Sequence, residues 1–343
     1  MSNEKKRTIE LLNLVVKFDD KGLVETFEDR FFPVIRGGKV RGRGEVETYR
    51  FEYLHFMLIE GVPIFAGRLL KFMTLEAEQD FDEASEKLIE STKTMPSVPS
   101  SFFVIDLTTH RLAYLSETRR APSSNDLQYC ISKLLNSDYA KRRKEAKSKV
   151  LENLGLLRVT KKVRDQVDKK IDSMVPKSYI NLRSLPELKK VGKTLDPFEI
   201  ITKLIIKPLP RNNELSKENS QFLRQYEKRQ DKLGSISSSL VMGNTKDGLK
   251  KVATKDLVKQ ASTGNYAVKV MGKDSQGEDI DSDLQNISVK FREKIPAKEE
   301  VENRTKRLFK KLQDAFSKGY IVTVEVTAET RRLAIDIVNR LKV

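Results

Sequence analysis

The sequence predicts an α+β fold with two domains of mixed, mainly antiparallel sheet with helices, joined by a basic helical middle segment. Three observations lead to this prediction. The chain has 343 residues, which exceeds the usual size of one domain. Strand-like alternation dominates its first third and returns in its last third, and helical periodicity with many Lys and Arg residues lies between them. We therefore expect an N-terminal α+β domain at 1–136, a basic helical connector at 137–195 and a C-terminal α+β domain at 196–343.

The first strands are predicted from their hydrophobic pattern. Residues 8–18 are rich in aliphatic and β-branched side chains, and residues 46–58 alternate between polar and apolar with a period of two. A regular strand over the second run places five side chains on one face, namely Tyr49, Phe51, Tyr53, His55 and Met57.

The rest of the first domain is expected to combine strands with one helix. Residues 62–73 predict a strand, and residues 100–107 and 111–117 predict a hairpin across a short Thr-Thr-His turn. Between them, residues 75–92 carry apolar side chains at helical spacing and predict a helix.

The stretch 34–44 is expected to form a glycine-rich cationic loop. It contains four glycines and four cations, which are Arg36, Lys39, Arg41 and Arg43. Glycine lets backbone amides approach a phosphate closely, so the loop is a candidate phosphate clamp. An equally good interpretation is an inter-strand loop whose charges keep a sheet edge soluble.

The middle of the chain predicts basic helices. Cap residues at 122–126 predict a helix over 127–135, a second helix follows from Ser137, and 158–175 repeats a valine or isoleucine every four residues. The candidate DNA-binding cations here are Lys141, Arg142, Arg143, Lys144, Lys147, Lys149, Lys161, Lys162, Arg164, Lys169, Lys170, Lys189 and Lys190. They either track phosphates or only solubilise the surface. Because a helix holds its cations in place, we expect those at 141–149 to matter more than the loop.

The last third again combines strands and helices. Proline-bounded apolar runs and alternation predict strands, and polar segments with a helical period predict helices. The expected strands are 197–211, 266–274, 286–294 and 320–326, and the expected helices are 213–233, 297–317 and 328–341. Residues 233–264 contain several Gly and Ser residues and predict an irregular, loop-rich segment.

The net charge of +16 is unevenly distributed and points to a polyanionic partner. Residues 141–211 hold 20 Lys and Arg against 8 Asp and Glu, which gives +12, whereas residues 1–140 are slightly acidic. Lys and Arg gain free energy by releasing counterions from phosphates, so this segregation favours nucleic-acid binding. The plain alternative is a charged surface that serves solubility.

Several classes of site are excluded or disfavoured. Cys130 is the only cysteine, and His55 and His110 are the only histidines, which excludes a zinc site of Cys/His type. No apolar run approaches a membrane span, so we expect a cytoplasmic protein. Residues 243–250 have the glycine spacing of a phosphate loop, but Leu249 replaces the required lysine. No small-molecule cofactor or metal is expected, and the absence of tryptophan favours duplex over single-stranded DNA.

Two other function classes remain open. A Mg²⁺-dependent nuclease uses an Asp with a Glu-x-Lys tripeptide on adjacent strands, and Asp106 with 145–147 or 187–189 matches those residue types. Neither tripeptide lies in a strand-like segment. A structural adaptor would use the basic surface to bind an acidic protein partner.

Three segments of the chain, 99–127, 204–211 and 268–280, carry a further indication. The residues concerned are chiefly Ser101, Phe102, Val104, Ala113, the run 122–127, the Ile-Lys-Pro of the second segment, Lys273, Asp274 and Gly277. In these residues, and in the order of the segments, the chain resembles the RexA-like exclusion proteins of lambdoid phages.

This resemblance implies a homodimer of two-domain subunits that binds double-stranded DNA without strong sequence preference. It also implies an intracellular sensor of phage defence that acts with a separate membrane effector protein. It supplies no catalytic residue and no specific DNA contact, so the candidate cations given above rest on charge alone.

Overall fold

The computed structural model describes most of the chain, and it confirms the α+β class. Helices and antiparallel strand pairs make up two units, each with its own hydrophobic core. The described residues are 4–42, 47–76, 79–82, 86–90, 93–153, 160–209, 221–235, 238–263, 266–284, 289–296, 298–322 and 324–342.

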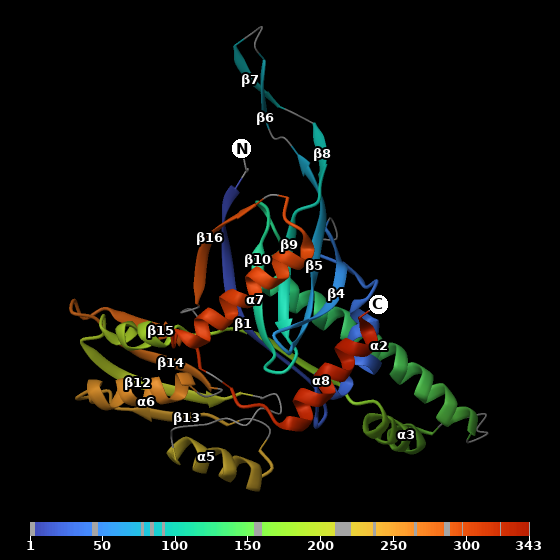
Figure 1. Cartoon of the computed structure of the whole chain (residues 1–343). Helices are drawn as coiled ribbons and strands as arrows, with labels where there is room; N and C mark the ends of the chain where they lie inside the picture. The colour runs from blue at the N-terminus through green and yellow to red at the C-terminus, as the bar shows by residue number, and fades with distance from the viewer. Residues whose placement is uncertain are drawn as a thin grey trace.

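One large antiparallel sheet organises the first unit (Figure 1). Its strands are β1 (Glu4–Phe18), β2 (Lys21–Gly22), β3 (Lys39–Arg41), β4 (Thr48–Ile59), β5 (Val62–Glu76), β8 (Thr94–Ser97), β9 (Ser100–Asp106), β10 (Arg111–Ser116), β11 (Ser178–Ser184) and β16 (Lys290–Pro296). They lie in the order β11-β1-β10-β9-β5-β4-β3, while β2 and β16 also pair with β1, and β8 pairs with β5. The predicted strand at 62–73 and the predicted hairpin of β9 and β10 are confirmed.

Helices cover both faces of this sheet. They are α2 (Ser124–Asn153) and α8 (Ala328–Leu341) on one face and α7 (Val301–Ser317) on the other. Because side chains alternate along a strand, Leu112 and Tyr114 pack with α2 and α8, whereas Ala113 and Leu115 pack with α7. Burial on both faces explains the nearly continuous apolar run of β10. The helices predicted near the C-terminus are confirmed as α7 and α8.

Short helical turns between β2 and β3 fill the face under α2 and α8. These turns are η1 (Val24–Thr26), η2 (Phe27–Phe31) and α1 (Phe32–Ile35). The ring centroid of Phe27 lies 5.3 Å from that of Phe65 and 5.9 Å from that of Phe56, both in edge-on geometry. This cluster anchors the chain where it enters the glycine-rich stretch.

A smaller antiparallel sheet forms the second unit. Its strands are β12 (Ile200–Pro208), β13 (Leu240–Gly243), β14 (Tyr266–Lys273) and β15 (Asp279–Asp283), in the order β13-β12-β14-β15. Its helical segments are α4 (Leu188–Val191), η3 (Gly192–Leu195), α5 (Gln221–Lys232) and α6 (Lys251–Thr263). They enclose a core that shares no residue with the cores of the large sheet.

The smaller unit is inserted between two strands of the large sheet. The chain leaves after β11 and returns at β16, and both of these strands pair with β1. At this neck, Leu185 N donates to Leu11 O at 2.9 Å, Leu11 N to Val289 O at 3.1 Å, and Val289 N to Leu185 O at 3.0 Å. The sheets and cores therefore do not follow the expected boundaries at 136 and 195, because 178–184 and 289–341 belong to the large unit.

Two predictions for the first third were wrong. The segment 75–92 contains β6 (Gln79–Asp82) and β7 (Lys87–Glu90), which pair antiparallel in a separate ribbon. In the sequence, Phe81 stands between two aspartates, and this alternation of polar and apolar residues has the period of a strand. In β4 the register shifts between Glu52 and His55, and Tyr53 has φ 54°. This bulge turns Phe56, rather than His55, to the face that Tyr49 and Phe51 share.

Further differences lie in the helices and the last segments. The two helices expected from 127 onward form one continuous α2 of 30 residues. The predicted loop at 233–264 contains β13 and α6, whose buried Val258 and Ala261 give it an amphipathic face. Within the described part of 320–326 the chain forms no strand. The helix at 213–233 is described only from Gln221 onward, as α5.

We expect Gly272→Ala in β14 to destabilise the smaller unit by about 1–3 kcal/mol, because its new Cβ is overpacked. The Cβ would overlap the carbonyl oxygen of Ile200 and lie 2.9 Å from Phe198 Cδ1. Hydrogen exchange of β12 and β14 amides, compared with that of β9, measures the effect. Gly243→Ala is the matched control, since its Cβ lies 3.5 Å from the nearest atom, the carbonyl oxygen of Thr202. An equal loss of amide protection in the two variants, or in both units of one variant, would contradict the tight packing around Gly272.

Candidate nucleic-acid interface

The basic middle of the chain forms a helical hairpin that projects from the large sheet (Figure 1). The first half of α2 is held by buried Leu127, Cys130, Ile131 and Leu135 in the core of that sheet. Its second half extends beyond the sheet and packs against α3 (Lys161–Met174). A helix of 30 residues is about 45 Å long, which is enough for both roles. The hairpin and the smaller unit lie at opposite sides of the large sheet.

An apolar seam joins α2 to α3. Val167, Ile171 and Val175 are buried, and they pack with partly buried side chains of α2 that include Tyr139 and Val150. The four-residue repeat is thereby confirmed as a packing stripe from Val163 to Val175, while Val159 lies outside the described residues. Thr160 caps the helix, since its hydroxyl accepts a hydrogen bond from Val163 N at 3.4 Å.

Two of the predicted DNA-binding residues form ion pairs across this seam. Arg143 lies 2.7 Å from Asp172 and 3.4 Å from Asp168, and Lys147 lies 2.9 Å from Asp168. The hydrogen bond from Lys147 lowers the pKa of the Asp168 carboxyl. The hydrogen bond with the Tyr139 hydroxyl, followed by Asp172, raises the pKa of Arg143. Both cations therefore fasten α3 to α2.

Arg142 is also engaged within the fold. Its Nε lies 2.6 Å from Asp138 Oδ2, and a terminal nitrogen donates to the carbonyl oxygen of Asp29 at 3.2 Å. Three of the candidate cations at 141–149 are thus paired within the fold, because the carboxylates that bind them lie on the preceding turn and on another helix.

The other cations of the hairpin are exposed and form no ion pair with any described residue. They are Lys141, Lys144 and Lys149 on α2 and Lys161, Lys162, Arg164, Lys169 and Lys170 on α3. The exposed carboxylates without an ion-pair partner in the described parts of these segments are Glu145 and Glu152 on α2 and Asp165 on α3. The surplus is thus larger on α3, with five cations against one carboxylate, than on α2, with three against two.

The two helices present these charges in different directions. At 100° per residue, Lys141 lies across α2 from Arg143 and Lys147, which face the seam. On α3, Lys162 and Lys169 lie across the helix from buried Val167 and Ile171. The outer faces of α2 and α3 are therefore two separate candidate surfaces, and the charge surplus favours that of α3.

The glycine-rich stretch is largely regular structure. Lys39 and Arg41 are exposed on β3, the edge strand of the large sheet, and Arg36 follows α1 with its guanidinium carbon 6.0 Å from the Phe32 ring centroid. Arg43 lies outside the described residues. A Cβ at Gly38 would lie 2.6 Å from Leu134 Cδ1, so this glycine permits close packing on α2. The arrangement supports the edge-protecting interpretation of Lys39 and Arg41.

The two cations of α4 have local partners. Lys189 Nζ lies 4.8 Å from the ring centroid of Tyr320, and Lys190 pairs with Glu187 at 2.7 Å. Both interactions lie beside the neck of the smaller unit, away from the hairpin. The structure therefore does not bring Lys189 and Lys190 together with the α2 and α3 cations.

The carboxylate proposed for a nuclease is used within its turn. Asp106 is 5 % exposed, and its Oδ1 accepts from Thr108 N at 2.8 Å and from the Thr108 hydroxyl at 2.6 Å. Its Oδ2 accepts from the Thr109 hydroxyl at 2.7 Å. The described residues contain no group of three His, Cys, Asp or Glu side chains placed to hold a metal ion.

Comparison with protein-family models and with curated proteins finds no match for this chain. The resemblance to RexA-like proteins therefore stays a prediction based on the three quoted segments. Among the described helices, none is both long and apolar enough to cross a membrane.

Asp168→Asn is expected to loosen α3, because it removes the carboxylate that binds Lys147 and Arg143. A lowered pKa means that the stabilisation is present above the ordinary aspartate pKa and is lost as pH falls through the lower native value. The protection factors of α3 amides, which correct for the intrinsic pH dependence of exchange, should therefore fall below about pH 4 in the native chain. This acid-dependent step should be smaller in the variant.

Asp165→Asn is the control, since Asp165 is exposed on the same helix and forms no ion pair with a described residue. If both variants gave the same exchange profile, the ion pairs across the seam would contribute nothing to the hairpin.

Proposed function

We propose that the chain binds double-stranded DNA through the α2–α3 hairpin, chiefly by phosphate contacts. The observation that carries this proposal is the set of eight exposed hairpin cations that lack an ion-pair partner among the described residues. They lie on helices held by an apolar seam and by ion pairs, so little conformational freedom is lost when they meet a phosphate. Phosphate contacts carry no base information, which supports binding without strong sequence preference.

The setting of this activity comes from the resemblance alone. The similar segments lie in β9, β10 and the start of α2, in β12, and from β14 to β15. On that basis we propose a cytoplasmic sensor of an anti-phage exclusion system that acts as a homodimer with a membrane effector protein.

The alternatives are less well supported by the geometry. A nuclease built on Asp106 requires a carboxylate free to hold Mg²⁺, and both oxygens of this side chain accept hydrogen bonds from the turn. An adaptor for an acidic protein would use the same exposed cations. Incubation with plasmid and Mg²⁺ separates the three classes, since a nuclease cleaves, a DNA-binding protein retains the plasmid intact, and an adaptor does neither.

Glutamine substitution on α3 at Lys162, Lys169 and Lys170 should weaken duplex binding more than substitution on α2 at Lys141, Lys144 and Lys149, because α3 carries the larger surplus of free charge. Fluorescence anisotropy at several salt concentrations measures both effects. Each lost phosphate contact should reduce the slope of log affinity against log salt by about 0.9.

Glutamine at Lys39 and Arg41 on β3 is the matched control and should change the affinity little. Unchanged binding in both helix variants, or a loss confined to the β3 variant, would refute the hairpin interface. The melting temperature of every variant should stay close to that of the native chain, because all of these side chains are exposed.

The proposed homodimer predicts a sedimenting species of twice the 39.3 kDa chain mass at micromolar concentration. Paired hairpins would lengthen the DNA footprint and raise avidity. A purely monomeric species with unimpaired DNA binding would exclude assembly while leaving the hairpin interface standing.

A further inference from the structure

A cavity of about 510 Å³ opens at the end of the large sheet beside the start of α7. Its walls come from β1, β5, β10 and β16, and the side chains that matter here are Lys5, Arg7, Tyr53, Arg68, Glu117 and Arg304. The volume falls in the range of small-molecule sites. Four cations and one carboxylate in this set give the cavity a positive lining.

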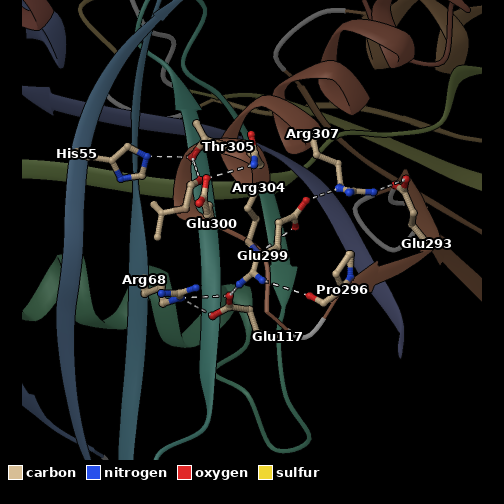
Figure 2. Close-up of polar contacts among 12 residues, drawn as sticks. His55, Arg68, Glu117, Glu293, Pro296, Glu299, Glu300, Arg304, Thr305 and Arg307 are labelled. Carbon is tan, nitrogen blue, oxygen red and sulfur yellow. Dashed lines mark hydrogen bonds and ion pairs between the residues drawn. The ribbon is translucent and has the colours of Figure 1, made fainter. Parts of the chain in front are cut away.

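The floor of the cavity is a buried ion-pair network (Figure 2). Arg68 Nε lies 3.0 Å from Glu117, and Arg304 pairs with the same carboxylate. Arg304 also reaches Glu299 at 3.4 Å, and the side chains of Arg304, Glu117 and Glu299 are only 5 to 8 % exposed. Each charge of the floor is paired inside the protein, so the floor fixes the shape of the cavity. The net positive charge of the cavity therefore comes from its walls.

The walls carry charge that the described residues do not balance. Lys5 and Arg7 project from β1, and neither forms an ion pair or side-chain hydrogen bond with a described residue. Arg7 is half-buried as a residue, and its guanidinium pairs with no described carboxylate. An anion in the cavity would supply the missing partner, and a guanidinium suits a phosphate because it donates two parallel hydrogen bonds.

The rim of the cavity presents an exposed aromatic ring. Tyr53 is 62 % exposed although it lies within β4, and its φ of 54° is unusual for a bulky side chain. The bulge turns this ring out of the core, and the Arg68 guanidinium carbon lies 5.1 Å from its centroid. Backbone strain of this kind is retained where surrounding structure imposes it, often at ligand sites. A flat ring next to a cation is a platform on which a heterocycle can stack.

We propose that this cavity binds a nucleoside monophosphate. The phosphate group would lie between Lys5 and Arg7, and the base would stack on Tyr53. An aromatic ring and two cations without an ion-pair partner among the described residues line one cavity, and this combination suits a ligand with an anionic end and a planar end. This site uses no residue of the hairpin, so it stands independently of the proposed DNA binding.

Calorimetric titration of the full-length chain with AMP, adenosine and inorganic phosphate tests the site. AMP should bind with a saturable signal and more tightly than either fragment. Arg7→Gln should weaken AMP and phosphate about tenfold, the effect expected for a lost charge-assisted hydrogen bond. Tyr53→Asn should weaken AMP about tenfold and leave phosphate unchanged, because asparagine tolerates positive φ but removes the stacking ring.

Lys6→Gln on β1 is the matched control and should leave AMP binding unchanged, because Lys6 is exposed between Lys5 and Arg7 on the strand but does not line the cavity. Melting temperatures of all variants without ligand show whether a loss of binding reflects unfolding. The absence of saturable AMP binding up to about 1 mM would overturn the proposal, as would unchanged AMP affinity in a folded Arg7→Gln variant. Binding of a 5′-phosphorylated oligonucleotide in place of AMP would also overturn it and would assign the cavity to a DNA end.

Discussion

The pairing of β1 is the constraint on which the rest of the structure depends. One edge of this strand binds β10, while the other binds β16 along its first half and β11 along its second half. At the point of exchange, the backbone of Leu11 hydrogen-bonds to Leu185 and Val289, which are 104 positions apart in sequence. The insertion of the smaller unit, the position of α7 after β16 and the exit of the hairpin into β11 all follow from these contacts.

Elements with strong local periodicity could be predicted from the sequence, whereas features set by distant contacts could not. The apolar run of β5, the hairpin of β9 and β10, and the helices α3, α7 and α8 each show their pattern within a short window. The face on which each β4 side chain lies after Glu52 could not be predicted, because the bulge at Tyr53 breaks an otherwise regular alternation. Nothing in residues 290–296 indicates that their partner is the first strand of the chain.

The same holds for the candidate interface, where the charge of a segment could be read from the sequence but the contact partners of its side chains could not. Charge segregation located the basic segment, but it could not show that Asp168 and Asp172 lie beside Arg143 and Lys147 across a helical seam. Nor could it identify the cavity residues. In the sequence Arg7 looks like an ordinary strand residue, and it becomes notable only because it lines the cavity and has no ion-pair partner within the described part of the chain.

The closed neck at Leu185 and Val289 has a consequence for how such a chain can be rearranged over generations. Because Val289 donates a backbone hydrogen bond to Leu185, a genetic deletion of the residues between them leaves a gap that one tight turn can span. The segment carries its own core, so it can be gained, lost or exchanged as a module without repacking the sheet it leaves. The sequences of the large sheet and of the smaller unit are thus free to diverge at different rates.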